Sequence, residues 1–121
     1  MRTATPHISR FNDFGVLPTP DGHLTFSSKS SKTTAEIQFA QVGRVWIAEY
    51  RFRFKCGGFH GRTLPLSVHS KGRSSLGEAL ADAASRMLAD AEIRCGDETQ
   101  INATQRNELA ELRAWVKSQI E

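Results

Sequence analysis

One short segment holds the residue types that do chemistry in proteins: AEYRFRFKCGGFHG, positions 48–61. Within it Cys56 and His60 have a C-x3-H spacing, and the chain offers two further soft metal ligands, His69 and Cys95. A structural zinc site usually presents two close pairs of ligands. The second pair here is separated by 25 intervening residues, so we expect no metal and no other cofactor. Whether the four side chains ever approach one another stays open.

Nucleophilic catalysis by the same segment has little to support it. A Cys56–His60 pair has no evident orienting carboxylate, and the GGFHG stretch lacks the helix start and the Lys-Ser/Thr of a phosphate-binding loop. Its glycines more simply permit a turn. We therefore assign no catalytic residue, and whether the protein is an enzyme stays open, with the balance against it.

Alternation of aromatic and basic residues is the clearest pattern in the segment. Successive side chains of a strand point to opposite faces, so Tyr50, Phe52 and Phe54 share one face. Arg51 and Arg53 share the other. We expect the rings to face a core and the guanidinium groups to face water. A platform that stacks nucleic-acid bases needs exposed rings beside the charges, and this arrangement does not supply them.

Basic residues elsewhere in the chain extend the candidate surface. The side chains that we expect to contact a protein partner or a nucleic acid are Lys29, Lys32, Arg44, Arg51, Arg53, Lys55, Phe59, Arg62, Lys71 and Arg73. Phe59 is the one ring among them, because its place in a glycine-rich turn favours exposure. Such a surface attracts phosphate groups without reading bases, and its affinity falls with salt.

Charge is divided unevenly along the chain, although the net charge is only +3. Residues 1–74 include 11 basic and 4 acidic residues, a net of +7, and residues 75–121 include 5 basic and 9 acidic residues, a net of −4. This asymmetry indicates a basic face and an acidic face, which steer charged partners. Ordinary solvation of strand and helix surfaces explains it equally well. An acidic helical surface that mimics nucleic acid would include Asp82, Asp90, Glu92, Asp97 and Glu98.

Hydrophobic periodicity predicts the strands that position these residues. Period-two alternation indicates three strands, at about 35–41, 45–56 and 62–69, which short turns join into an antiparallel meander. Pro65 cannot donate a hydrogen bond to a sheet ladder. We therefore place the third strand at an edge of the sheet, or Pro65 at a bulge.

Helical periodicity takes over in the last third of the chain. Ser-Leu-Gly-Glu is a capping box with Ser75 as N-cap, and apolar residues at helical spacing predict a helix at about 76–93 and another at about 103–120. The fold class is therefore α+β: a compact β-β-β-α-α core at 35–121, with the helices covering one face of the sheet. Residues 1–34 are expected to form an irregular arm, or a small hairpin around PTPDGH followed by a Ser/Lys-rich loop.

These elements support two resemblances. Strand, glycine-rich turn, strand, basic SKGRSS and alanine-rich LGEALADAASRML, over 46–88, resemble the second half of a double-stranded-RNA-binding domain. That resemblance implies that Lys71 and Arg73 grip phosphates across an RNA groove. A compact basic meander with helices is also similar in style to small accessory proteins of phages and mobile elements, such as anti-CRISPR proteins. This likeness implies a non-enzymatic protein that occupies a surface on a nucleoprotein machine.

The sequence thus predicts a single domain over residues 1–121 that binds and does not catalyse. We expect it to dock on a host protein or ribonucleoprotein complex, with direct binding of DNA or RNA as the alternative and a homodimer as a further option. No window approaches the roughly 18 apolar residues of a membrane span. The N-terminus lacks the apolar core of a signal peptide, so we expect a cytoplasmic protein without a membrane partner.

Overall fold

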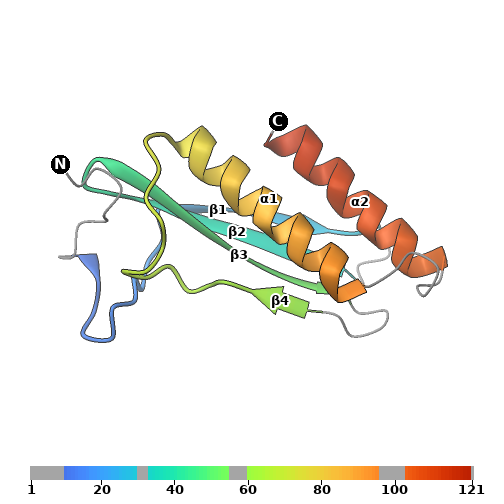
Figure 1. Ribbon diagram of the computed structural model, residues 1–121, viewed down its shortest axis with the longest axis horizontal. Helices are drawn as coiled ribbons and strands as arrows, with labels where there is room; N and C mark the ends of the chain where they lie inside the picture. Colours follow the sequence, from blue (N-terminus) through green and yellow to red (C-terminus); the bar gives the residue numbers. More distant parts are fainter. Residues whose placement is uncertain (1–9, 30–32, 55–59, 96–102, 121) are drawn as a thin grey trace.

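The computed structural model describes residues 10–29, 33–54, 60–95 and 103–120. Its elements are β1 (Gly22–Ser27), β2 (Thr33–Val42), β3 (Val45–Phe54), β4 (His60–Arg62), α1 (Leu76–Cys95) and α2 (Ala103–Gln119). The strands form one antiparallel sheet in the order β1-β2-β3-β4, and both helices lie on the same face of it (Figure 1). The α+β class and the two C-terminal helices are confirmed. Within the described ranges, no helix combines the length and apolar composition that crossing a membrane requires.

The sheet has one strand more than the sequence predicted. Residues 22–27, expected to lie in an irregular arm or in a small hairpin around PTPDGH, form β1, which pairs along its whole length with β2. Leu24 and Phe26 alternate there with polar residues, and a hydrogen bond of 2.9 Å from the Ser28 N–H to the Thr33 carbonyl closes the hairpin. The hairpin therefore joins β1 to β2, and the expectation of a hairpin folded around PTPDGH is wrong.

The third predicted strand is much shorter than expected. An extended strand over 62–69 is wrong beyond Arg62, because β4 ends there. Pro65 has no N–H to donate, and the chain leaves the edge of β3 to form a loop. It returns at Arg73, whose N–H and C=O exchange hydrogen bonds of 2.8 Å with the main chain of Trp46.

The main core lies between the sheet and the helices. Tyr50, Phe52 and Phe54 are 4%, 3% and 0% exposed, whereas Arg51 and Arg53 between them are exposed. The prediction that the rings face the core and the guanidinium groups face water is therefore confirmed. Four alanines of α1 belong to the same buried cluster as these rings, and their small side chains permit a close approach of the helix to the sheet.

A second, smaller core covers the opposite face at one end of the sheet. Its buried members are Leu17, Ala40, Val42, Ile47 and Leu66. The cover consists of two segments, 10–17 and 63–70, which are joined by a main-chain hydrogen bond of 2.9 Å from Leu17 to Leu66. The sheet is thus covered on both faces near the β2–β3 turn and on one face only at its other end.

The start of α1 follows the predicted cap. The Glu78 N–H donates to the Ser75 hydroxyl oxygen at 3.1 Å, which confirms Ser75 as the N-cap. The Glu78 carboxylate accepts a hydrogen bond from the Ser74 hydroxyl at 2.9 Å. This cap fixes where the helix begins, and so where α1 lies over β3 and β4.

Candidate binding surface

Two cross-strand rows of polar side chains occupy the uncovered part of the sheet. From β1 to β4, one row is Thr25, Glu36, Arg51 and Arg62, and the other is Ser27, Thr34, Arg53 and His60. All eight point away from the helices, because the residues that alternate with them along each strand face the core. Glu36 is half-buried and the others are exposed. We call these eight residues the open face.

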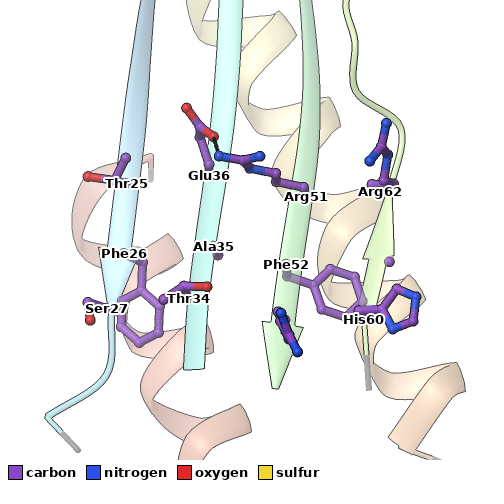
Figure 2. A pocket seen from close by; sticks show the side chains of 12 residues that line it. Thr25, Phe26, Ser27, Thr34, Ala35, Glu36, Arg51, Phe52, His60 and Arg62 are labelled. Carbon is purple, nitrogen blue, oxygen red and sulfur yellow. Dashed lines mark ion pairs between the residues drawn. The ribbon is translucent and has the colours of Figure 1, made fainter. Parts of the chain in front are cut away.

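The open face is hollowed. A solvent-open cavity of about 1030 Å³ lies over it, and Figure 2 shows side chains from all four strands around this space. Three strand spacings of about 4.8 Å give a width of about 14 Å from β1 to β4. An α-helix with its side chains is about 10–12 Å across. The hollow therefore has room for one helix or for an extended segment.

The electrostatics of the open face are dominated by arginine. Arg51 Nη2 lies 2.7 Å from Glu36 Oε1 (Figure 2), and Gln38 Nε2 donates to the other carboxylate oxygen at 3.2 Å. In the part of the chain that the structure describes, neither Arg53 nor Arg62 has an ion-pair partner. One carboxylate thus faces three guanidinium groups, and two of these stay available to a ligand.

The structure brings together three of the predicted binding residues and separates others. Arg51, Arg53 and Arg62 meet on the open face. Arg44 lies in the β2–β3 turn, seven residues before Arg51, which corresponds to about 23 Å along the strand. Three other predicted residues, Lys32, Lys55 and Phe59, lie outside the described ranges.

The remaining predicted cations are not among the residues that line the hollow. Lys29 follows β1, and its N–H donates to the Glu111 carboxylate of α2 at 3.1 Å. Lys71 is exposed in the loop before α1. Arg73, which the RNA-binding resemblance assigns to phosphate, lies 2.9 Å from the Asp82 carboxylate. The charge of Arg73 is therefore already compensated within the protein.

Sequence reasoning missed the polar half of the open face. Its hydroxyl groups and its imidazole were not assigned to the binding surface: Thr25, Ser27, Thr34 and His60. A signal was present in HLTFS, where polar residues alternate with Leu24 and Phe26 as in a half-buried strand. The partner strand, which decides whether such a short segment joins a sheet, is not visible in that pattern.

The helical carboxylates are used within the protein. Each of the described members of the proposed acidic surface forms an ion pair: Asp82 with Arg73 and Arg86, Asp90 with Arg94, and Glu92 with Arg113. Asp97 and Glu98 lie outside the described residues. Because arginines of the same chain neutralise these three carboxylates, the helical surface does not present the free negative charges that mimicry of nucleic acid would need.

Glu49 marks the boundary between the covered and open parts of the sheet face. Its buried carboxylate accepts a hydrogen bond from Ser70 Oγ at 2.8 Å and from Arg86 Nη1 at 3.1 Å. Arg86 also donates to the Ala48 carbonyl at 3.2 Å. Burial opposes the charge on Arg86, but the Glu49 and Asp82 carboxylates outweigh it and raise the pKa of the guanidinium group. This network links α1 to the part of β3 with which β4 does not pair.

The candidate metal ligands are only partly described. Cys56 lies outside the described ranges, and the structure gives no side-chain placement for Cys95. His60 lies on β4 and His69 in the loop that follows. Among the described residues, no three His, Cys, Asp or Glu side chains lie close enough to hold a metal ion.

Comparisons with protein-family models, with curated proteins and with solved structures found no match. On the open face, Arg53 and Arg62 have no ion-pair partner among the described residues, and both line the hollow.

Proposed function

We propose that this is a non-catalytic binding protein that docks on an acidic segment of a protein partner through its open face. The observation behind this proposal is the convergence of Arg51, Arg53 and Arg62 around one hollow, with Glu36 as the only acid in the two rows. Cross-strand neighbours lie about 5 Å apart. Their guanidinium groups can therefore bind several carboxylates of one segment, with the short charge-assisted hydrogen bonds that arginine forms.

A protein segment suits this surface better than a nucleic acid does. The rings of β3 that would stack on bases, Tyr50, Phe52 and Phe54, are buried on the other face. Glu36 also lies within the cationic rows and pairs with Arg51, so the rows do not present an unbroken line of cations to a chain of phosphates. A protein segment can place a polar or basic side chain at that position. The hydroxyl groups of Thr25 and Ser27 suit the same partner, since they can bond to its polar groups.

The partner class that we propose is a host protein or a nucleoprotein complex. An inhibitor of the anti-CRISPR kind would use the open face to occupy an acidic patch on such a complex and so exclude another ligand. Binding of this kind would be fast and salt-dependent, because opposite charges steer the encounter.

Charge reversal at the open face tests this proposal. Purified wild-type protein, the Arg53→Glu/Arg62→Glu double variant and the Arg44→Glu control are each used to capture partners from host lysate. The expected partner is retained by wild type and by Arg44→Glu and is lost from the double variant. An acidic peptide added in excess should displace it. Equal capture by all three proteins would reject the open face as the docking surface.

Direct binding of DNA or RNA is the second candidate, because three arginines on one face also attract phosphates. A salt-titrated gel shift with single- and double-stranded DNA and RNA separates the two functions. A shift that weakens with salt and disappears in the Arg53→Glu/Arg62→Glu variant would favour nucleic acid. No shift at low ionic strength would eliminate it.

A further inference from the structure

The outer edge of β1 presents hydrogen-bonding groups that no described residue engages. The Ser28 N–H donates to the Thr33 carbonyl, and the Thr33 N–H donates to the Ser28 hydroxyl oxygen, so these two residues occupy a hydrogen-bonded pair position of the β1–β2 hairpin. Such pairs alternate along an antiparallel ladder, so Phe26 and Leu24 also bond to β2. The residues between them direct their N–H and C=O groups away from β2: His23, Thr25 and Ser27. The main-chain hydrogen bonds of the described chain do not engage these groups.

The residues of β1 also lack three of the features with which proteins protect a sheet edge. Short edges, charged side chains and prolines discourage pairing with another chain. β4, the opposite edge, is three residues long, includes Arg62 and is followed by Pro65. β1 is six residues long, GHLTFS, with no proline and no Lys, Arg, Asp or Glu. Of the two edges of the sheet, β1 is therefore the one open to a further strand.

We propose that β1 pairs with β1 of a second copy of this chain, in antiparallel register about a two-fold axis at Thr25. In this register Thr25 faces Thr25 of the second copy, and His23 faces Ser27. Every outward N–H and C=O of these three residues then finds a partner, which makes about six main-chain hydrogen bonds. No like charges face each other, so nothing in the strand opposes the pairing.

The apolar side of β1 is complementary to itself in the same register. Leu24 of one copy lies opposite Phe26 of the other, in a pair without main-chain hydrogen bonds, where side chains are closest. Both residues are only half-buried in the single chain. The Phe26 ring lies 5.6 Å from that of Trp115 of α2, which is also half-buried. A second copy would extend the main core across the edge formed by β1.

A second copy fits this edge better than a strand of the acidic partner. The cations of the sheet are on β3 and β4, so an acidic strand added beside β1 would find no arginine next to it. A strand with the sequence of β1 satisfies all the outward groups and pairs large with medium apolar side chains. The edge is therefore matched to itself and not to an anion.

In such a dimer, the four-stranded sheets of the two copies join edge to edge into one continuous sheet. A two-fold axis perpendicular to the sheet keeps both open faces on the same side. The two copies of β3 are then separated by five strand spacings, about 24 Å. The dimer does not depend on the proposed function, but it would present two arginine clusters to one partner and so raise avidity.

Sedimentation equilibrium over a range of concentrations tests the dimer. The wild-type protein should sediment with twice the mass of the chain at high concentration. Thr25→Pro removes an outward N–H without breaking a bond to β2, and Thr25→Lys places a charge on the axis. Both variants should halve the observed mass. Thr34→Lys adds the same charge to the same face but on β2, and it should leave the dimer intact.

Amide hydrogen exchange of the wild-type protein provides an independent readout. Exchange at His23, Thr25 and Ser27 should slow as concentration rises, whereas Leu24 and Phe26 should be protected at every concentration. Circular dichroism shows whether each variant is folded. If Thr25→Pro does not fold, Thr25→Lys still tests the dimer. A wild-type protein that stays monomeric, or a dimer that survives Thr25→Lys, would overturn the proposal.

Discussion

The two ends of the sheet face that points away from the helices differ in cover and in charge. Near the β2–β3 turn, Ala40 and Ile47 are 0% exposed and pack with Leu66 of the covering loop. Further along the same sides of β2 and β3, the side chains are polar or charged: Thr34, Glu36, Arg51 and Arg53. The change occurs in both strands at the same cross-strand pair, Gln38 and Glu49.

This difference shows how one strand contributes to a core and to a binding surface. The alternation of β3 is unbroken from Val45 to Phe54, so its helical face is apolar throughout. Only the content of its other face changes, from Ile47 to Arg51. The covering segments are short and reach only part of the sheet, and the remaining part is left as the open face.

Truncation at the two ends should have very different costs. Ile47→Ala removes a fully buried side chain beneath the cover and should lower the free energy of unfolding by about 2–5 kcal/mol. Arg53→Ala, on the same face at the open end, should change it by less than about 0.5 kcal/mol. Urea unfolding followed by tryptophan fluorescence measures both. Similar losses in the two variants would contradict the division into covered and open ends.

The boundary residue should have an intermediate effect. Glu49→Ala leaves Arg86 and Ser70 without their shared acceptor and should cost about 1.5–3 kcal/mol. The matched control is Glu36→Ala, whose partner Arg51 is largely exposed and should be affected by only about 0.2–1 kcal/mol. Thermal and urea unfolding of both variants test this order. If Glu36→Ala lost more stability than Glu49→Ala, Glu49 would not be the residue at which the covered part of the sheet ends.

The stability of the fold should also depend on the contact between α1 and the open end of the sheet. Tyr50 Oη donates to Asp90 Oδ2 at 2.8 Å, so Tyr50→Phe should cost about 1 kcal/mol. Burial, followed by the Asp90 carboxylate, raises the pKa of Tyr50. In the unfolded chain it ionises near pH 10, so this contribution is complete below about pH 10 and declines as the pH rises further. Tyr50 is the only tyrosine.

Because Tyr50 is the only tyrosine, the Tyr50→Phe variant has no phenol that ionises at alkaline pH. Wild type and Tyr50→Phe should converge in stability as the pH is raised above about 10, because only the wild-type unfolded chain gains from ionising the phenol. Unfolding curves collected at a series of alkaline pH values test this convergence. A constant difference between the two proteins would show that the Tyr50 hydroxyl group does not titrate differently on folding.

The smallest expected effect concerns the attachment of the cover. The Arg10 guanidinium, and next the Gln41 N–H at 2.7 Å, lower the pKa of Asp21. Asp21→Asn should cost less than about 1 kcal/mol, since the pair is partly exposed. A lowered pKa stabilises the fold above the unfolded value, near 3.9, and this contribution is lost as the pH falls through the folded pKa. The two proteins should therefore become equally stable in acid, as acid unfolding curves can test.

Much of the fold was predictable because its strongest signals are local. The helices differ from their predicted bounds by one or two residues at most, since a long apolar stripe defines each helix and a capping serine marks the start of α1. β2 and β3 were recognised from alternation. β1 was missed because a six-residue strand with only half-buried and exposed positions, set amid turn residues, gives a weak signal. β4 was placed too late, because the apolar residues Leu64 and Leu66 belong to the second core and not to a strand.

The candidate site was only partly predictable. Arg51 and Arg53 follow directly from alternation, but their neighbours come from other strands. Arg62 joins them because β4 pairs with β3 in one particular register. Arg44 has the same side chain yet lies at the far end of the sheet, a separation that composition cannot reveal.

The sequence by itself determined which way β3 faces, since alternating side chains in an extended strand must lie on opposite sides. It also determined the two helices, through spacing that depends only on near neighbours. The tertiary structure alone decided which end of the sheet is covered and which arginines meet. Those outcomes depend on strand register and on packing between residues far apart in the chain, such as Leu17 with Leu66 and Arg51 with Arg62.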